Sequence, residues 1–250
     1  MSIELKGTGV IVVDVVAWYT RGMPRRARSI VGGLCYHVLN RANGRLRLFK
    51  KDADFLAFEN VLVQARQRVS LRILAYVVMS NHWHFVVWPE QGDDQQVSEF
   101  FRWLTVTHTQ RWHAHHGTSG MGHLYQGRFK SFPVQSDEHL WTVLKYVERN
   151  PLRARLVKQG EHWRFGSLWR RASGDAEGLL SDGPIDLPRN WIAYVNRGQP
   201  KSDLAALRTS VQRGRPFGVE AWQEKTAYQL GLQFTFRSRG RPYKVSPPKQ

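Results

Sequence analysis

Two histidines separated by one bulky residue, His82 and His84, have the residue type and spacing for metal chemistry. They open the run His82-Trp-His-Phe-Val-Val-Trp88, which is too short for a helix and is rich in aromatic and β-branched residues, so a strand is predicted. Alternate side chains of a strand share a face, and the two imidazoles therefore point the same way, about 7 Å apart along the strand. Such a pair can bind one metal ion, although an isolated His-x-His is also typical of two solvated surface histidines.

A second pair of reactive residues lies on a predicted helix, which Ser136 caps and Pro151 is expected to end. Tyr146 and Asn150 are four residues apart and so share one face of this helix. The phenol of tyrosine has a pKa near 10 and is a poor nucleophile at neutral pH without assistance. A tyrosine at this position is otherwise a half-buried helical residue with no chemistry.

Hydrophobic periodicity predicts the elements that must position these side chains. We expect strands over residues 33–40, 71–79, 82–88 and 124–135, and helices over residues 52–68, about 95–115 and 136–150. The order β, α, β, β, α, β, α resembles a ferredoxin-like antiparallel sheet with helices on one face and an open face on the other. The predicted fold class is therefore α+β, with a small basic, mainly helical C-terminal region added.

The charge balance indicates a polyanionic partner. The 250 residues carry a net charge of +17 and have a sequence pI near 10.6, and nucleic acid is the usual partner of such a protein. A membrane partner is not indicated, because the sequence shows no basic amphipathic helix with a clean apolar face. The apolar run Gly9–Trp18 is too short to span a bilayer. The single cysteine, Cys35, cannot form an internal disulfide, which favours the cytoplasm.

Basic residues that could contact nucleic acid occur in several segments. Arg128 and Lys130 flank Phe129, an interleaving of cations with an aromatic ring that suits single-stranded nucleic acid and also suits an edge strand protected by charge. The triplet Gly-Arg-Pro occurs twice, at residues 214–216 and 240–242, each time after an arginine. Such arginines can enter an A·T-rich minor groove, or they can belong to a disordered basic tail. The predicted DNA-binding residues are Arg41, Arg128, Lys130, Arg153, Arg213, Arg215, Arg239 and Arg241.

These residues together resemble the single-tyrosine HUH transposases and, more closely, the REP-associated tyrosine transposases. The resemblance covers about residues 25–169, with a further match near residues 213–218. It rests on five motifs in a specific order: Tyr36-His-Val-Leu-Asn-Arg41, Met79-Ser-Asn-His82, His82-Trp-His84, Gln126-Gly-Arg-Phe-Lys-Ser131 and Leu144-Lys-Tyr146-Val-Glu-Arg-Asn150-Pro-Leu-Arg-Ala154.

The resemblance implies a metal-dependent enzyme that cleaves and rejoins single-stranded DNA at the hairpins of palindromic repeats. Tyr146 would be the nucleophile and would form a 5′-phosphotyrosine, while His82, His84 and Asn150 would bind Mg²⁺ or Mn²⁺. Tyr125 is the rival nucleophile, but it lies where the family places a structural aromatic residue. The alternatives are a DNA-binding protein that keeps the fold without catalysis and a relative that acts on RNA, and either a monomer or a homodimer is compatible with the sequence.

Composition divides the chain into four segments. We expect an extension outside the fold at residues 1–22, a transposase domain at residues 23–171, a linker rich in Gly, Ser, Asp and Pro at residues 172–188, and a basic DNA-binding region at residues 189–250.

A chain that begins at Met23 should fold and cleave DNA like the full chain, because no pattern links the earlier segment to the predicted sheet. The melting temperatures of the two chains would test this expectation. A large decrease on truncation would indicate that the Gly9–Trp18 run packs as a strand.

Overall fold

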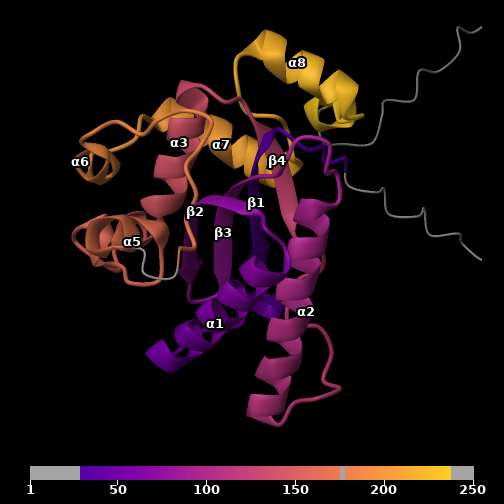
Figure 1. Ribbon diagram of the computed structural model, residues 1–250, viewed down its shortest axis with the longest axis vertical. Coiled ribbons are helices and arrows are strands. Elements are labelled where there is room, and N and C mark those ends of the chain that lie inside the picture. Colours follow the sequence, from indigo (N-terminus) through magenta and orange to yellow (C-terminus); the bar gives the residue numbers. More distant parts are fainter. Residues whose placement is uncertain (1–28, 175–177, 238–250) are drawn as a thin grey trace, which may run out of the picture.

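The structure, a computed structural model, describes residues 29–174 and 178–237 (Figure 1). Residues 1–22, Arg239 and Arg241 lie outside the described residues. The strands are β1 (Cys35–Arg41), β2 (Arg72–Met79), β3 (His82–Trp88) and β4 (Lys130–Val134). The α-helices are α1 (Asp52–Arg68), α2 (Gln96–His116), α3 (Glu138–Glu148), α4 (Asn150–Arg153), α5 (Ser167–Ser173), α6 (Trp191–Asn196), α7 (Lys201–Arg213) and α8 (Glu220–Gln229). Short 3-10 turns are η1 (Asn43–Arg45), η2 (Gly160–His162) and η3 (Gln233–Phe236).

The four strands form one sheet in the order β2-β3-β1-β4, and each neighbouring pair is antiparallel. Because β3 lies between β1 and β2, the unit β1-α1-β2 is a split β-α-β arrangement. The element order from β1 to α3 is the predicted one. The predicted α+β fold, an antiparallel sheet accompanied by helices, is therefore confirmed.

Helices cover both faces of this sheet, which corrects the expectation of helices on one face only. On one face, Trp83 and Phe85 of β3 pack with α1 and α2 in a single hydrophobic core. On the other face, Val86 and Val77 pack against α3, and the later helices α5, α6 and α7 extend this second core. The reason lies in β2 and β3, whose side chains are apolar on both sides of the strand and must be buried on both.

The helix that carries Tyr146 differs in detail from the prediction. Asp137, one residue after the predicted cap Ser136, caps α3, since its Oδ1 accepts a hydrogen bond from the backbone N–H of His139 at 2.9 Å. Pro151 does not end the helical path. It lies in the first turn of α4, where a missing N–H costs nothing.

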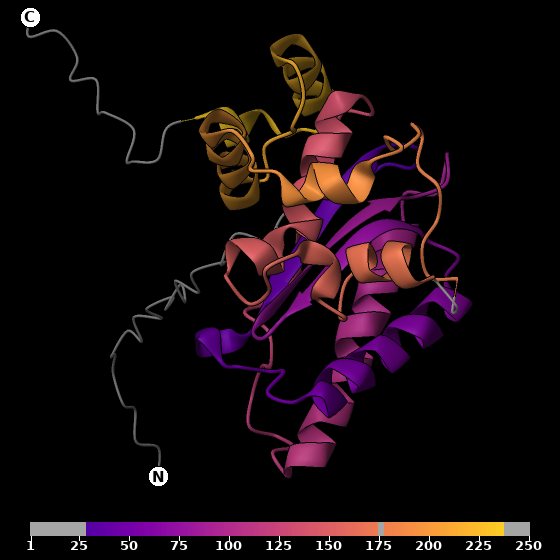
Figure 2. The ribbon, with the colours of Figure 1, turned by 90° about the vertical axis from the view of Figure 1, so that its left-hand side faces the viewer.

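The segment predicted as a linker packs against the sheet where it is described. The backbone N–H of Ser181 donates to Ile73 O at 2.9 Å, and Leu179 is buried in the core beside α1 and α2. Trp191 and Val195 of α6 then enter the core beside α3. The helical character predicted for the C-terminal region is confirmed, and its helices lie at the opposite end of the molecule from α1 (Figures 1 and 2).

The buried carboxylate of Glu148 joins the end of α3 to this C-terminal region. Its Oε1 accepts hydrogen bonds from the Ser167 hydroxyl at 2.6 Å and from Arg171 Nε at 3.0 Å, and its Oε2 accepts from Trp191 Nε1 at 2.6 Å. The Glu148 side chain is fully buried. Three elements, α3, α5 and α6, therefore meet at one negative charge.

Replacing Glu148 by alanine should lower the free energy of unfolding by about 3–5 kcal/mol, because Arg171 and two buried donors lose their acceptor. Urea unfolding would measure the change. The matched control is Glu138→Ala, which removes an exposed glutamate from the same helix and should cost less than about 1 kcal/mol. Similar losses in the two variants would contradict a structural role for the buried carboxylate.

Candidate active site

His82 and His84 point toward α3, on the face of β3 opposite to Trp83 and Phe85. Their ring centroids are 5.0 Å apart and the ring planes are nearly perpendicular, at 87°. His82 Nδ1 lies 2.6 Å from Asn81 Oδ1. A carbonyl oxygen can only accept, so His82 Nδ1 donates and the Nε2 lone pair is left for a ligand.

A third histidine, His37 of β1, lies on the same face and contacts His84. His37 Nε2 is 3.0 Å from His84 Nδ1, and His37 is fully buried. If His84 donates from Nδ1, its Nε2 lone pair is available in the same way as that of His82. The His37 ring also packs on Phe132, with centroids 4.8 Å apart, which fixes its orientation.

Tyr146 of α3 lies against these histidines. Its ring centroid is 6.0 Å from that of His84 and 6.2 Å from that of His37, both in edge-to-face geometry, and the residue is 8% exposed. Asn150 follows one helical turn later, and its Nδ2 is buried without a hydrogen-bond partner among the described residues. The guanidinium carbon of Arg153 lies 4.2 Å from the centroid of the Tyr146 ring. The structure therefore brings His82, His84 and Tyr146 together.

Burial keeps the three imidazoles neutral. It lowers the pKa of His82 to about 4, and the charges of Arg41 and Arg153 act in the same direction. Burial also lowers the pKa of His37 to about 3 and holds the pKa of His84 well below its usual value, with the neighbouring histidines adding to the effect. At neutral pH each ring therefore keeps a lone pair.

Two predicted DNA-binding residues lie on the same face of the sheet. In the antiparallel register Arg41 pairs with His82, and Leu39 pairs with both His84 and Lys130. Directly paired residues point to the same face, so Arg41 and Lys130 share the face of the histidines. Both are exposed. This end of the sheet is therefore positively charged.

Arg128 and Arg213 both line a cleft of about 520 Å³ at the outer edge of β4. The cleft lies between residues 126–131 and the C-terminal segment, and Lys130 and Phe234 also line it. Arg213 donates from Nη1 to Arg237 O at 2.5 Å. Arg215, in contrast, is held by Gln223 Oε1 at 2.9 Å and stacks on Phe236.

Comparison with known proteins identifies the fold that carries this site. Residues 30–150 match the model of one family, transposase IS200 like. The matched residues, a little less than half of the chain, are therefore similar to the IS200-like transposases. The chain is also similar to the REP-associated tyrosine transposase of Escherichia coli (strain K12), with 27% identity over 161 residues, which are 64% of this chain and 88% of that relative. The resemblance noted in the sequence is confirmed.

Among solved structures, the chain is similar to a REP-associated tyrosine transposase bound to a REP hairpin. The identity is 22% and the TM-score is 0.48, and the match covers 66% of this chain and 93% of that one.

Tyr125 lies on the opposite face of the sheet from the histidine pair, where it is buried in the core. Its hydroxyl accepts from Trp83 Nε1 at 3.3 Å and lies 2.8 Å from His108 Nδ1, to which it donates. Burial raises the pKa of Tyr125 well above that of a free phenol. These contacts favour a structural role and leave Tyr146 as the tyrosine beside the histidines.

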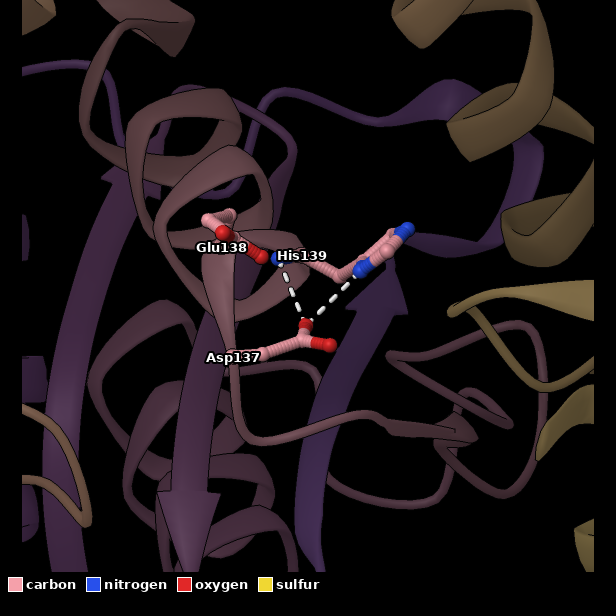
Figure 3. Close-up of side chains that lie close together, drawn as sticks. All are labelled: Asp137, Glu138 and His139. Carbon is pink, nitrogen blue, oxygen red and sulfur yellow. Dashed lines mark hydrogen bonds and ion pairs between the residues drawn. The ribbon is translucent and has the colours of Figure 1, made fainter.

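A separate acidic group surrounds the start of α3. Asp137, Glu138 and His139 have ligand atoms within 4.8 Å of one another (Figure 3). The same Asp137 Oδ1 already accepts from the His139 backbone N–H and lies 2.7 Å from its ring Nδ1. We interpret this group as a helix cap.

His37 is the functional candidate that the sequence did not single out. The motif Tyr36-His-Val-Leu-Asn-Arg41 contains it, and strand alternation predicts its face. Its contact with His84 depends on the pairing of β1 with β3, 47 residues away along the chain. No periodicity within one segment gives that register.

Acid should destabilise the protein through its buried histidines. Burial lowers the pKa of His108 to about 3, whereas a histidine in the unfolded chain titrates near 6.5. Between these values the unfolded state binds a proton that the folded state does not, so the free energy of unfolding decreases as the pH falls. For His108 the loss at pH 5 should be on the order of 2 kcal/mol.

Urea unfolding at pH 7.5 and pH 5 would measure this loss. His108→Gln keeps an acceptor for the Tyr125 hydroxyl but does not titrate, so its stability should decrease less over the same interval. Equal decreases in the two proteins would contradict the contribution of His108.

Proposed function

We propose that this protein is a transposase, a metal-dependent single-stranded DNA endonuclease and strand transferase that acts at hairpins of palindromic repeats. The observation that carries the proposal is the edge of the Tyr146 ring against His84, with His82 next to it on one largely buried face. Binding DNA without cleaving it requires none of these contacts. The match of residues 30–150 to the model of the IS200-like transposases supports the same conclusion.

The proposed metal ligands are His82, His84 and Asn150. Two neutral imidazoles offer lone pairs, and the Asn150 amide has a buried atom without a partner among the described residues, which fits a cation site. Rotation of an amide by 180° exchanges its nitrogen and oxygen, so this position can present Oδ1. When bound, Mg²⁺ or Mn²⁺ would stabilise the charge of the scissile phosphate.

Tyr146 supplies the nucleophile in the proposed reaction. Its phenolic oxygen forms a bond to the scissile phosphorus and loses its proton to solvent, while the P–O3′ bond breaks and the 3′ oxygen leaves as a protonated hydroxyl. The product is a 5′-phosphotyrosine. Because this ester retains the phosphodiester bond energy, a second 3′-OH can displace the tyrosine and rejoin strands. Helix α3, packed on the sheet, keeps the ring beside the histidines during both steps.

The proposed partner is single-stranded hairpin DNA. The net charge of +17 supports it, as do Arg41, Lys130, Arg128 and Arg213 near the edge of the sheet. The name of the E. coli relative associates that protein with REP elements. None of the described helices combines the length and the apolar character needed to cross a bilayer. A cytoplasmic location and the choice between monomer and homodimer stay predictions.

Tyr146→Phe should abolish covalent adduct formation, because it removes the attacking oxygen and keeps the ring. The measurement is incubation with labelled hairpin DNA and Mg²⁺ or Mn²⁺, followed by a denaturing gel, with an RNA hairpin of the same sequence in parallel. Melting temperature and hairpin affinity should stay near those of the wild type. If only the RNA hairpin formed an adduct, the proposed substrate would be RNA and not single-stranded DNA.

His82→Ala should reduce adduct formation by at least about 100-fold, since one proposed ligand is lost. Excess Mn²⁺ should partly restore this variant through the remaining ligands and should not restore Tyr146→Phe. Tyr125→Phe is the matched control and should cleave nearly normally. If Tyr125→Phe formed no adduct while Tyr146→Phe still formed one, the nucleophile would be misassigned.

A further inference from the structure

Arg153 is the cation in contact with the proposed nucleophile. It is the last residue of α4, the short helix that begins at Asn150, and its guanidinium carbon lies 4.2 Å from the centroid of the Tyr146 ring. A guanidinium at this distance is attracted to the ring by a cation–π interaction. This contact occupies none of the guanidinium N–H donors, which stay available for hydrogen bonds.

One of these donors has no protein partner. Arg153 Nη1 is buried and makes no hydrogen bond among the described residues. The neighbouring charges that act on Arg153 include two further cations, Arg149 and Arg208, and the ion pairs found among the described residues do not involve Arg153. Arg153 itself is partly buried, but a charged guanidinium nitrogen sealed from solvent without a counter-ion is costly, so this position suits an anionic ligand.

The position of this anion follows from the neighbours of Arg153. The charge of Arg153 acts on both His82 and His84, so the guanidinium lies close to the proposed metal ligands as well as to Tyr146. An anion that meets Arg153 Nη1 is therefore close to the Tyr146 ring and to the two histidines. In a reaction on DNA, the group at that place is the phosphate under attack.

We propose that Arg153 is a catalytic residue that binds a non-bridging oxygen of the scissile phosphate, an inference that rests on the proposed function. Its guanidinium contacts the Tyr146 ring, and its N–H donors neutralise charge on the phosphate as the phenolic oxygen bonds to phosphorus and the P–O3′ bond breaks. Arg153 contributes no atom and no proton to the products. Charge-assisted donors of this kind act mainly in the transition state.

Arg41 is the rival for this role, since its charge also acts on His82 and His84. It differs from Arg153 in being exposed and in lying at the end of β1 rather than over the tyrosine ring. These features suit a contact to the DNA backbone outside the reacting centre.

The test compares a natural scissile linkage with a neutral methylphosphonate, in which a methyl group replaces one non-bridging oxygen and removes the charge. Wild type, Arg153→Gln, Arg153→Lys and the control Arg155→Gln, which removes an exposed arginine two residues away, are assayed on both hairpins at saturating DNA. Each diastereomer of the methylphosphonate is measured separately. Melting temperature and hairpin affinity are recorded for every variant.

On the natural linkage Arg153→Gln should slow adduct formation by about 100-fold, the usual cost of losing one such donor. On the methylphosphonate the same substitution should cost less than about 3-fold, because no charge remains to be neutralised. Hairpin affinity should decrease by less than about 10-fold, as expected for one phosphate contact. Arg153→Lys, which keeps the charge, should recover part of the rate, and Arg155→Gln should match the wild type.

Equal losses on the two linkages would overturn the proposal, since Arg153 would then only position Tyr146. A normal rate in Arg153→Gln would overturn it as well. If Arg153→Gln does not fold, the loss of rate in Arg153→Lys is compared between the natural linkage and the methylphosphonate instead, and equal losses would overturn the proposal. An adduct in the wild type keeps the proposed function intact in each of these cases, whereas a wild type without an adduct overturns both proposals.

Discussion

The position of the proposed nucleophile depends on a buried negative charge. Glu148 ends α3 two residues after Tyr146, and its carboxylate is sealed from solvent by Ser167, Arg171 and Trp191. A buried carboxylate is tolerated only when its lone pairs are satisfied. The C-terminal segment must therefore close over this end of α3 in one arrangement. The same arrangement sets the direction of α4, which follows α3 directly, and therefore the positions of Asn150 and Arg153.

A second contact strengthens the link between the C-terminal helices and the site. Arg149, between α3 and α4, donates from Nη1 to Val195 O at 3.0 Å and to Asn196 O at 2.6 Å, at the end of α6. These bonds satisfy carbonyls that the end of a helix leaves without partners. The chain after residue 172 thus belongs to the structural support of the candidate site, whatever it contributes to DNA affinity.

Much of the site was predictable because its signals are local. The two-residue period of β3 separates His82 and His84 from Trp83 and Phe85, and the 3.6-residue period of α3 places Tyr146 beside its apolar stripe. Contacts between residues that lie far apart along the chain are not predictable from local periodicity. The contacts of His37 with His84, and of Glu148 with Arg171 and Trp191, depend on which elements pair in space, and no single segment encodes that.

The covered second face of the sheet was predictable in principle. The segment that forms β2, Arg72-Ile-Leu-Ala-Tyr-Val-Val-Met79, is apolar without alternation, which is typical of a strand buried on both faces. The ferredoxin-like order of the elements, in contrast, indicates a sheet with one open face. A continuous apolar strand therefore carries more information about the layers of a fold than the order of its elements does.

The first Arg-Gly-Arg-Pro segment illustrates how packing changes the meaning of a motif. As a sequence it fits either a minor-groove arm or a disordered tail. In the structure Phe217, directly after it, donates from its backbone N–H to Pro133 O and accepts from Gln135 N–H, both at 2.9 Å, along the outer edge of β4. Together with the stack of Arg215 on Phe236, these bonds would have to break before an extended arm could enter a groove. Covering the edge also protects it from pairing with another chain. The segment is thus a folded part of the basic surface, in which Arg213 lines the same cleft as Lys130.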